Sequence, residues 1–388
     1  MRFPIALYQL EQAFEQHLAI LRPAQRRGLA LWVLGTLLAR SACQSAVVLA
    51  LSLYQNPHAL RQRLREWLYD GCDKRAACRT QLDVQACFAP LLRWVLAWWH
   101  ERQLVLALDA SLDRNRHAAL VVSLLYRGTA LPLAWQLLPA NTKGAWRSHL
   151  LRLLRLLWRA VPPDMPVVLL VDRGLWSPAL WRRIRRLGWH ALMRVPAHTA
   201  FESPAWRAAG RARVPGPGHA WVGQGRMGKR KARRLPSTLV VVWGEGQKEP
   251  WVLLTDLPPR AVGLGWYGLR MWIECGFAAL KSLGWQWERT RRTDPVRQAR
   301  YFLVLAVATL WTVATGTRVE DAQREGRAPQ SLRKPVGPPR QSARKLSVFR
   351  LGLTWLQHLA RSRLWTQLWL WPEPLPEPPP GLQWVMDI

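Results

Sequence analysis

Four polar residues between positions 267 and 281 have the types and the spacing of a chemical site. They are Tyr267, Arg270, Glu274 and Lys281. The apolar residues among them recur at helical spacing, so at about 100° per residue the four polar side chains fall within about 60° of one another. All four would then face the same bound object. The alternative is an ordinary amphipathic helix on which Arg270 and Glu274 form an ion pair.

The spacing Tyr-x2-Arg-x3-Glu-x6-Lys resembles the YREK signature of bacterial insertion-sequence transposases of the DDE type. In that family the Glu is the third catalytic carboxylate, and the Tyr, Arg and Lys hold the phosphates and flanking bases of the transposon end. The resemblance therefore implies that Glu274 is catalytic and that Tyr267, Arg270 and Lys281 bind DNA. It also implies two catalytic aspartates upstream, at strand ends. Cys275 departs from the family, in which a second acidic residue often follows the Glu.

Two short apolar runs upstream each end in an aspartate. Residues 104–108 precede Asp109, and residues 167–171 precede Asp172. Continuous apolar runs of this length are typical of strands that are buried on both faces. The two aspartates therefore lie where the resemblance requires them.

The elements that would position these aspartates indicate an α/β fold. Strands are predicted at 104–108, 117–126, 129–138, 167–171 and 190–195, and helices at 144–160 and 177–187. The order of three strands, helix, strand, helix and strand matches the start of the ribonuclease-H-like fold. In that fold the first and fourth strands are neighbours, so Asp109 and Asp172 would meet. The predicted DDE triad is Asp109, Asp172 and Glu274.

Three clustered carboxylates would repel one another unless a cation binds among them or their pKa values rise. Their hard oxygen atoms favour Mg²⁺, with Mn²⁺ as a substitute. Two such ions would activate a water or a 3′-hydroxyl and neutralise the leaving oxygen. We therefore expect Asp109, Asp172 and Glu274 to be the metal ligands. Asp113 and Asp256 are excluded, because the first lies beyond the predicted strand end and the second lies in a proline-containing turn.

The composition indicates a partner with many negative charges. Lys and Arg number 56 against 24 Asp and Glu, which gives a net charge of +32, and the arginines are spread along the whole chain. This balance favours nucleic acid as the partner. A hydrophobic content of 49% and 25 tryptophans indicate a packed fold rather than a basic tail.

The location expected from the sequence is cytoplasmic and nucleoid-associated. The five cysteines form no CxxC pair and have no zinc-site spacing, so we interpret them as reduced thiols. No signal peptide is evident at the start of the chain. The longest apolar run, residues 301–313, is too short to cross a bilayer and predicts a buried helix, so no membrane partner is expected.

Five segments are expected along the chain. They are a helical DNA-binding domain (1–100), the first part of the ribonuclease-H-like core (101–195), a β-rich insertion (196–262), the second part of the core with the catalytic Glu (263–316), and a basic linker, C-terminal helix and proline-rich tail (317–388). The basic run 226–234 would contact DNA, the alternative being a solvated loop. A helix is predicted from Asp294 to about Ala314.

The function expected is a DNA transposase that binds the ends of its insertion sequence and catalyses metal-dependent cleavage and strand transfer on double-stranded DNA. The alternatives are a host nuclease with the same fold and an inactive relic that only binds DNA. Because two ends need two active sites, we expect a homodimer on paired ends. The apolar helix 351–371 is a candidate contact, the alternative being that it packs on its own core.

Overall fold

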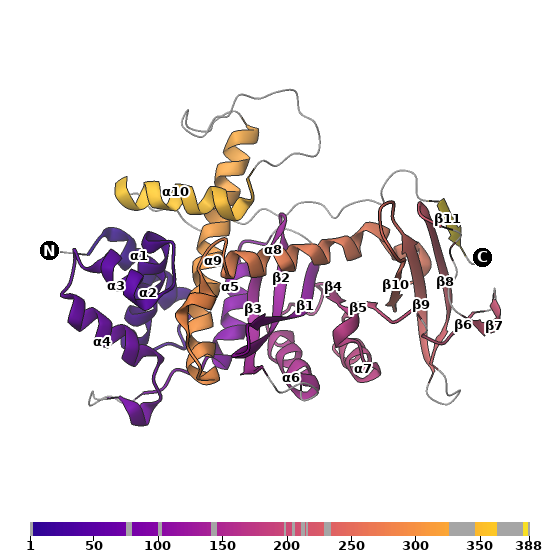
Figure 1. Ribbon diagram of the computed structural model, residues 1–388, viewed down its shortest axis with the longest axis horizontal. Helices are drawn as coiled ribbons and strands as arrows, with labels where there is room; N and C mark the ends of the chain where they lie inside the picture. The colour runs from indigo at the N-terminus through magenta and orange to yellow at the C-terminus, as the bar shows by residue number, and fades with distance from the viewer. Residues whose placement is uncertain are drawn as a thin grey trace.

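The structure is a computed structural model, and it describes residues 3–74, 80–99, 103–140, 146–197, 199–203, 206–210, 214, 216–228, 234–325, 346–362 and 383–386. A helical region, a large mixed sheet with helices on both faces, and two further helices follow one another along the chain (Figure 1). The architecture is therefore mixed α/β, as the sequence predicts.

The described part of residues 3–99 contains helices and no strand, which agrees with the prediction. The elements are α1 (Ile5–His17), α2 (Pro23–Ala39), α3 (Gln44–Leu51), α4 (Pro57–Leu68) and α5 (Phe88–Leu96), with the short 3-10 turns η1 (Gly71–Asp73) and η2 (Gln85–Cys87). Helix α4 begins at a clear cap, because the Asn56 side chain accepts the amides of His58 and Ala59 at 2.9 and 3.3 Å. Pro57 occupies the first turn, where no amide donor is needed.

The strands form one sheet in the order β3-β2-β1-β4-β5-β10-β9-β8-β6-β7, with β11 beside β8. Their bounds are β1 (Leu104–Asp113), β2 (His117–Tyr126), β3 (Thr129–Pro139), β4 (Val167–Val171), β5 (His190–Arg194), β6 (Phe201–Ser203), β7 (Trp206–Gly210), β8 (His219–Met227), β9 (Leu235–Trp243), β10 (Trp251–Thr255) and β11 (Gln383–Met386). Strand β1 pairs with β4 in parallel, so the predicted adjacency of the first and fourth strands is confirmed.

One strand end differs from the prediction. Strand β1 continues past Asp109 to Asp113, because residues 109–113 keep pairing with β2, from Asp109 opposite Val121 to Asp113 opposite His117. The apolar run ends at Leu108, but the hydrogen-bonded ladder does not. Asp113 therefore lies inside the strand rather than beyond it.

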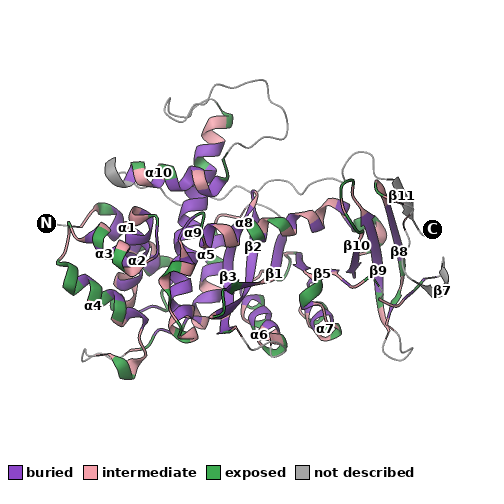
Figure 2. Cartoon of the chain, viewed as in Figure 1, coloured by how far each residue is buried: buried purple, intermediate pink, exposed green. Residues whose placement is uncertain are grey.

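Alternate residues of the central strands face opposite sides of the sheet. Leu104, Leu106 and Leu108 belong to the core that contains helices α6 (Trp146–Trp158) and α7 (Pro178–Arg186). Val105 and Ala107 belong to a second core on the other face, together with Tyr267 and Ile273. The strands are buried on both faces (Figure 2), which explains their continuous apolar runs.

The insertion at residues 196–262 adds strands to the core sheet rather than forming a separate layer. Strand β10 pairs antiparallel with β5, with Leu254 opposite Met193, and the β8–β9 hairpin continues the sheet outwards. The basic run 226–234 lies at the end of this hairpin, with residues 229–233 outside the described residues. Arg234 pairs with Glu202.

The single helix predicted over residues 267–285 is wrong in detail. The chain forms a 3-10 helix η6 (Leu264–Arg270), the α-helix α8 (Met271–Leu280) and a 3-10 turn η7 (Trp287–Thr290). Two other short 3-10 turns, η3 (Arg173–Leu175) and η5 (Pro259–Ala261), lie earlier in the chain. Helix α8 ends where the Trp285 amide returns to the Ala279 carbonyl at 2.9 Å. A β-carbon at Gly284 would overlap that carbonyl, so this glycine permits the close return.

Helix α9 (Pro295–Arg324) begins as predicted, because Asp294 accepts the amides of Val296 and Arg297 at 2.8 and 3.2 Å. It extends beyond the predicted end near Ala314. Gly316 does not stop the helix, because it lies where α9 crosses α10 (Val348–Ser362): a β-carbon there would overlap the Val348 carbonyl. Gly352 of α10 meets the Thr312 carbonyl in the same way.

Helix α10 packs on its own chain over its described part. Leu351, Leu353, Leu356 and Leu359 are buried, and α10 lies against α9 (Figure 1). This outcome is the alternative stated for the helix 351–371, of which residues 363–371 lie outside the described residues, as do residues 372–380 of the proline-rich tail.

Helix α9 is the core helix expected around residues 301–313. It is long and apolar enough to span a membrane by length and composition, but 94% of its most apolar window is buried inside the protein. Its aromatic and aliphatic side chains contact α2, α8 and β3. Within the described residues, burial explains the apolar composition of this helix.

Candidate active site

The register of two parallel strands brings Asp109 and Asp172 together. Leu108 of β1 lies opposite Val171 of β4, so each aspartate is the next residue along its strand. By the alternation of side chains, both aspartates point to the face that carries Tyr267 and Ile273 rather than to the face that carries α6 and α7. The sequence predicts this juxtaposition, and the register accounts for it.

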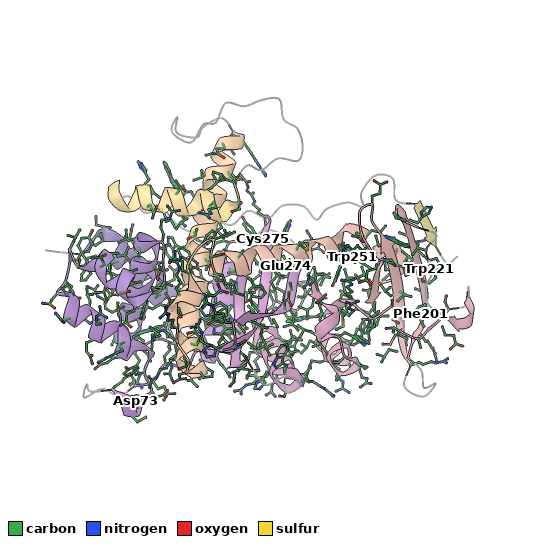
Figure 3. The ribbon with its side chains drawn as sticks, viewed as in Figure 1. Asp73, Phe201, Trp221, Trp251, Glu274 and Cys275 are labelled. Carbon is green, nitrogen blue, oxygen red and sulfur yellow. The ribbon has the colours of Figure 1, made fainter. Side chains whose placement is uncertain are left out.

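Arg270 contacts all three predicted carboxylates. Its Nη2 lies 2.9 Å from Asp109 Oδ2 and 3.7 Å from Asp172 Oδ2, and its Nη1 lies 3.1 Å from Glu274 Oε1. Glu274 lies beside Cys275 on α8 (Figure 3). Three carboxylates from β1, from the end of β4 and from α8 therefore surround one guanidinium group.

The environment of the site favours a charged arginine. Burial alone lowers the pKa of Arg270, but the charges of Asp109 and Asp172 more than offset this effect and raise it. Burial raises the pKa of the Asp109 carboxyl, although Arg270 and the Ala110 amide, which donates to Asp109 Oδ1 at 2.8 Å, act in the opposite direction. Arg270 therefore supplies the positive charge that lets these carboxylates lie close together.

Tyr267 supports the second aspartate. Its hydroxyl donates to Asp172 Oδ1 at 3.3 Å, and its ring packs edge-on against Trp251, with centroids 5.2 Å apart. Burial is the largest cause that raises the pKa of the Tyr267 hydroxyl above its usual range, and the Asp172 charge adds to it. The Tyr267 hydroxyl therefore stays protonated at neutral pH and acts as a hydrogen-bond donor.

Lys281 does not join the three carboxylates, contrary to the predicted common face. Its ammonium donates to the Leu112 carbonyl at 2.8 Å and lies 3.5 Å from Glu288. Leu112 is three residues along β1 from Asp109, or about 10 Å at the rise of a strand. The end of α8 at Leu280 turns the chain before Lys281 and directs its side chain to this neighbouring position.

The two aspartates excluded by the sequence analysis have structural partners. Asp113 pairs with Arg116 at 2.8 Å inside the β1–β2 hairpin. Asp256 accepts the Ala191 amide and the His190 ring, each at 2.8 Å, and also pairs with Arg185. Neither contacts the triad residues in the described part of the chain.

The oxygen atoms of the three carboxylates are of the kind that binds a divalent metal. In this structure, however, the carboxylates surround Arg270. Within the described residues no three His, Cys, Asp or Glu side chains are grouped so as to hold an ion. The carboxylates of Asp109 and Asp172 instead contact Nη2 of the guanidinium, and that of Glu274 contacts Nη1. The hard carboxylate oxygen atoms would suit Mg²⁺ once the Arg270 guanidinium has moved away from them. Sequence reasoning did not anticipate this position of Arg270, because two of its partners are remote in sequence.

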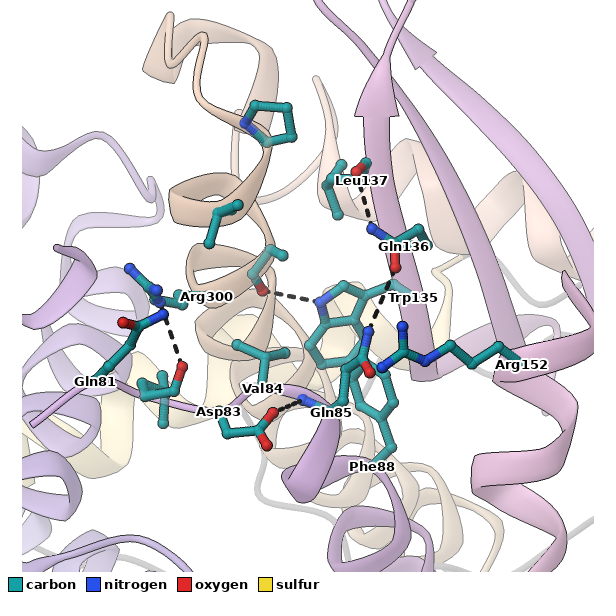
Figure 4. A pocket seen from close by; sticks show the side chains of 14 residues that line it. Gln81, Asp83, Val84, Gln85, Phe88, Trp135, Gln136, Leu137, Arg152 and Arg300 are labelled. Carbon is teal, nitrogen blue, oxygen red and sulfur yellow. Dashed lines mark hydrogen bonds between the residues drawn. The ribbon is translucent and has the colours of Figure 1, made fainter. Parts of the chain in front are cut away.

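A cavity of about 490 Å³ lies away from this site, between the helical region, β3 and the start of α9 (Figure 4). Two of its larger polar side chains, Arg300 and Trp135, have partners within the protein. Arg300 donates to the carbonyls of Leu68 and Leu82 at 2.6 and 3.4 Å, and the Trp135 indole donates to the Ala299 carbonyl at 2.9 Å. This cavity is therefore a gap between packed elements, not a second cluster of carboxylates.

The fold combines a mixed sheet, two aspartates at neighbouring strand positions and a glutamate on a helix that packs on the sheet. The family model described as "Transposase DDE domain" matches residues 103–311, which is more than half of the chain. The chain belongs to this transposase family. No curated protein shows a significant match to it.

Proposed function

We propose that the protein is the transposase of a bacterial insertion sequence, which binds the ends of its element and catalyses metal-dependent DNA cleavage and strand transfer. The observation that carries the proposal is the convergence of Asp109, Asp172 and Glu274 on one guanidinium group. The strand order β3-β2-β1-β4-β5, with a glutamate-bearing helix packed on β1, β2 and β3, supports a ribonuclease-H-like core. The family supports DNA as the substrate.

The proposed reaction needs no covalent enzyme intermediate. In cleavage, water attacks the phosphorus at the element end, the bond to the 3′ oxygen breaks, and that oxygen takes up a proton. In strand transfer, the freed 3′-hydroxyl attacks a phosphodiester of the target, so one bond forms for each that breaks. Mg²⁺ held by Asp109, Asp172 and Glu274, or Mn²⁺ in its place, would activate the attacking oxygen and neutralise the leaving one.

Arg270 and Tyr267 have a double role in this proposal. Arg270 holds the carboxylates together before the substrate arrives. When DNA binds, the Arg270 side chain leaves the carboxylates and binds a phosphate of the DNA end with two parallel hydrogen bonds. Tyr267 keeps Asp172 oriented through its hydroxyl. Lys281, beside Leu112, is positioned to contact DNA farther along the same edge of the sheet.

Two ends of one element need two active sites, so we propose a homodimer on paired ends that acts in the cytoplasm on nucleoid DNA. The buried leucines of α10 are covered by their own chain. We therefore expect the contact between protomers at another surface.

The decisive test is a Glu274→Gln variant. It keeps the size of the side chain and removes its charge, so cleavage of a duplex that bears an element end should fall by more than about 100-fold, since even the outer partners of a metal ligand contribute 10- to 100-fold. Binding of that duplex should persist. Cys275→Ser, at the exposed neighbouring position, is the matched control and should cleave normally. Normal cleavage by Glu274→Gln would remove Glu274 from the triad.

An assay of DNA cleavage and strand transfer distinguishes the transposase from the two alternatives, a host nuclease and an inactive relic. A transposase should transfer the cleaved 3′ end to a target plasmid, whereas a nuclease of the same fold should only cut. An assay for joined product with the wild-type chain decides between them. If the wild-type chain binds ends but neither cuts nor joins them with Mg²⁺ or Mn²⁺, the copy is inactive.

A further inference from the structure

A basic groove lies between helices α6 and α7, on the face of the sheet opposite to the triad. It has a volume of about 540 Å³, and we call it the α6–α7 groove. It is lined by Ser148, Leu151, Arg152, Arg155, Leu156, Arg159 and Arg183. Helices α6 and α7 belong to the core on the face of Leu104, Leu106 and Leu108, whereas Asp109 and Asp172 point to the other face. The sheet therefore separates this groove from the site around Arg270.

The arginines of this groove have no acidic partner within the described residues. No ion pair involves the side chains of Arg152, Arg155, Arg159 or Arg183, although other surface arginines are paired. Arg185, on the same helix as Arg183, pairs with Asp256. Four positive groups without a counter-charge around one hollow are an electrostatic match for a polyanion.

The spacing on α6 fits a regular array of charges. Arg152 and Arg155 of α6 and Arg159 of the turn that follows it are separated by three and four residues, so they continue one stripe. The stripe is about 10 Å long at the rise of an α-helix. Successive phosphates of one DNA strand advance by about 3.4 Å along the duplex axis, so two or three of them fall within this length. Arg183 adds a donor from the neighbouring helix.

The lining of the groove favours contact with the backbone rather than with bases. Guanidinium groups bind phosphate oxygens in a bidentate fashion. Leu151 and Leu156 offer no donor or acceptor side chain to a base edge, and Ser148 is the remaining polar lining residue. Such a surface would position DNA without reading its sequence.

We propose that the α6–α7 groove binds the phosphate backbone of double-stranded DNA outside the segment held at Asp109, Asp172 and Glu274. The proposal rests on the proposed transposase function and deepens it, since it assigns a second contact on the opposite face of the same sheet. It explains why the four arginines that line this groove have no ion-pair partner within the described residues. An acidic protein segment would be the competing occupant.

The test compares two triple variants that remove the same charge from the region of α6 and α7. The groove variant is Arg155→Ala/Arg159→Ala/Arg183→Ala. The control is Arg147→Ala/Arg182→Ala/Arg186→Ala, at exposed positions that do not line the groove. Binding to a fluorescent duplex without element ends is measured as a function of salt concentration, after thermal unfolding has shown that both variants fold.

The salt slope of the groove variant should become shallower by about 2 to 3, because each lost phosphate contact removes about 0.9 from the slope. The control should change it by less than about 1. Equal changes in both variants would mean that only net charge matters, and an unchanged slope in the groove variant would leave the groove to a different partner. Either result overturns the proposal. If the groove variant is unstable, Arg155→Gln/Arg159→Gln gives the same comparison, with an expected change of about 1 to 2.

Cleavage separates this proposal from the proposed function. The groove variant should still cut a short duplex that bears an element end, because the triad lies on the other face. If the wild-type chain cuts such a duplex and the groove variant keeps the wild-type salt slope, the groove proposal fails and the function stands. If the wild-type chain neither cuts nor joins, the proposed function fails while the groove comparison remains measurable.

Discussion

Arg270 and the arginines of the α6–α7 groove lie on opposite faces of one sheet and differ in how their charge is balanced. Arg270 has three carboxylates within 4 Å, at distances of 2.9, 3.7 and 3.1 Å. Arg155 and Arg159 have no ion-pair partner within the described residues. The charge of Arg270 is balanced by neighbouring carboxylates, whereas the charges of Arg155 and Arg159 are available to a bound partner.

This difference separates two uses of arginine in a very basic chain. A paired guanidinium holds protein groups in place, and its loss leaves carboxylates without a counter-charge. An unpaired guanidinium on the surface contributes little to folding and is available to a phosphate. Net charge alone, +32 for this chain, does not distinguish the two.

The largest effect is expected where a paired arginine is buried. Arg127 pairs with Glu320 at 2.9 Å and with Asp321 at 2.7 Å, and its side chain is only 1% exposed. Arg127→Met should lower the free energy of unfolding by about 3 to 5 kcal/mol, because it removes the buried cation that lies nearest to the Glu320 carboxylate. Denaturant unfolding measures this change.

The matched control for Arg127→Met is Arg155→Met in the groove. It should change the free energy of unfolding by less than about 0.5 kcal/mol, as is usual for surface positions. Similar losses in both variants would show that the groove arginines also support the fold, and the contrast between the two kinds of arginine would disappear.

An intermediate effect is expected at the triad itself. Arg270→Ala removes the cation that the carboxylates now surround, so Mn²⁺ should bind the DNA-free protein at least about tenfold more tightly. The estimate follows from an interaction of about 4 kcal/mol between unit charges 4 Å apart near a protein surface. Isothermal titration calorimetry with Mn²⁺ measures this affinity directly.

Arg155→Ala serves as the control for Arg270→Ala, because it removes the same charge from the opposite face. It should leave the affinity for Mn²⁺ unchanged. Weaker binding of Mn²⁺ by Arg270→Ala would show that the arginine organises the metal ligands rather than competing with the metal.

The smallest effect concerns pH. Burial raises the pKa of Asp109, so its folding contribution is fully present below the unfolded pKa of about 3.9 and is lost as pH rises through the higher folded value. The ionised carboxyl is therefore a net cost at neutral pH. Asp109→Asn should raise the Tm slightly at pH 7.5, and the gain should shrink as the pH approaches 4.

Asp164→Asn, at an exposed aspartate, is the matched control. Thermal unfolding at several pH values compares the two variants with the wild-type chain. A lower Tm for Asp109→Asn at pH 7.5 would show that pairing with Arg270 outweighs the burial of Asp109.

The central strands and the meeting of Asp109 with Asp172 could be predicted because their signals are local. Residues 104–108 and 167–171 are continuous apolar runs that end at Asp109 and Asp172, and the order of elements implies their adjacency. The capped start of α9 at Asp294 is equally local. Short-range patterns of this kind do not depend on packing against distant parts of the chain.

Two of the errors occurred where a glycine has a tertiary role. Gly316 was expected beyond the end of a helix, but it lies in the middle of α9 at its crossing with α10. Gly284 was included in a helix, but it allows the chain to return to Ala279 and so directs Lys281 away from the triad. A sequence pattern cannot distinguish these uses, because the partner helix or carbonyl is not visible in it.

The place of Arg270 could not be predicted for a related reason. Its contact with Glu274 follows from helical spacing, but its contact with Asp109 joins residues 161 positions apart. Only the register of β1 against β4 and the packing of η6 on the sheet bring these groups together.

The pairing of β10 with β5 has a consequence for attempts to shorten the protein. Strand β5 is an interior strand because β10 covers its outer side, with Leu254 opposite Met193. A minimal catalytic fragment without residues 196–262 would present the backbone amides and carbonyls of β5, flanked by the apolar residues Ala191, Leu192 and Met193, as a new sheet edge. Such edges recruit other chains. The fragment should aggregate even with its triad intact, so the insertion also serves as a solubility device.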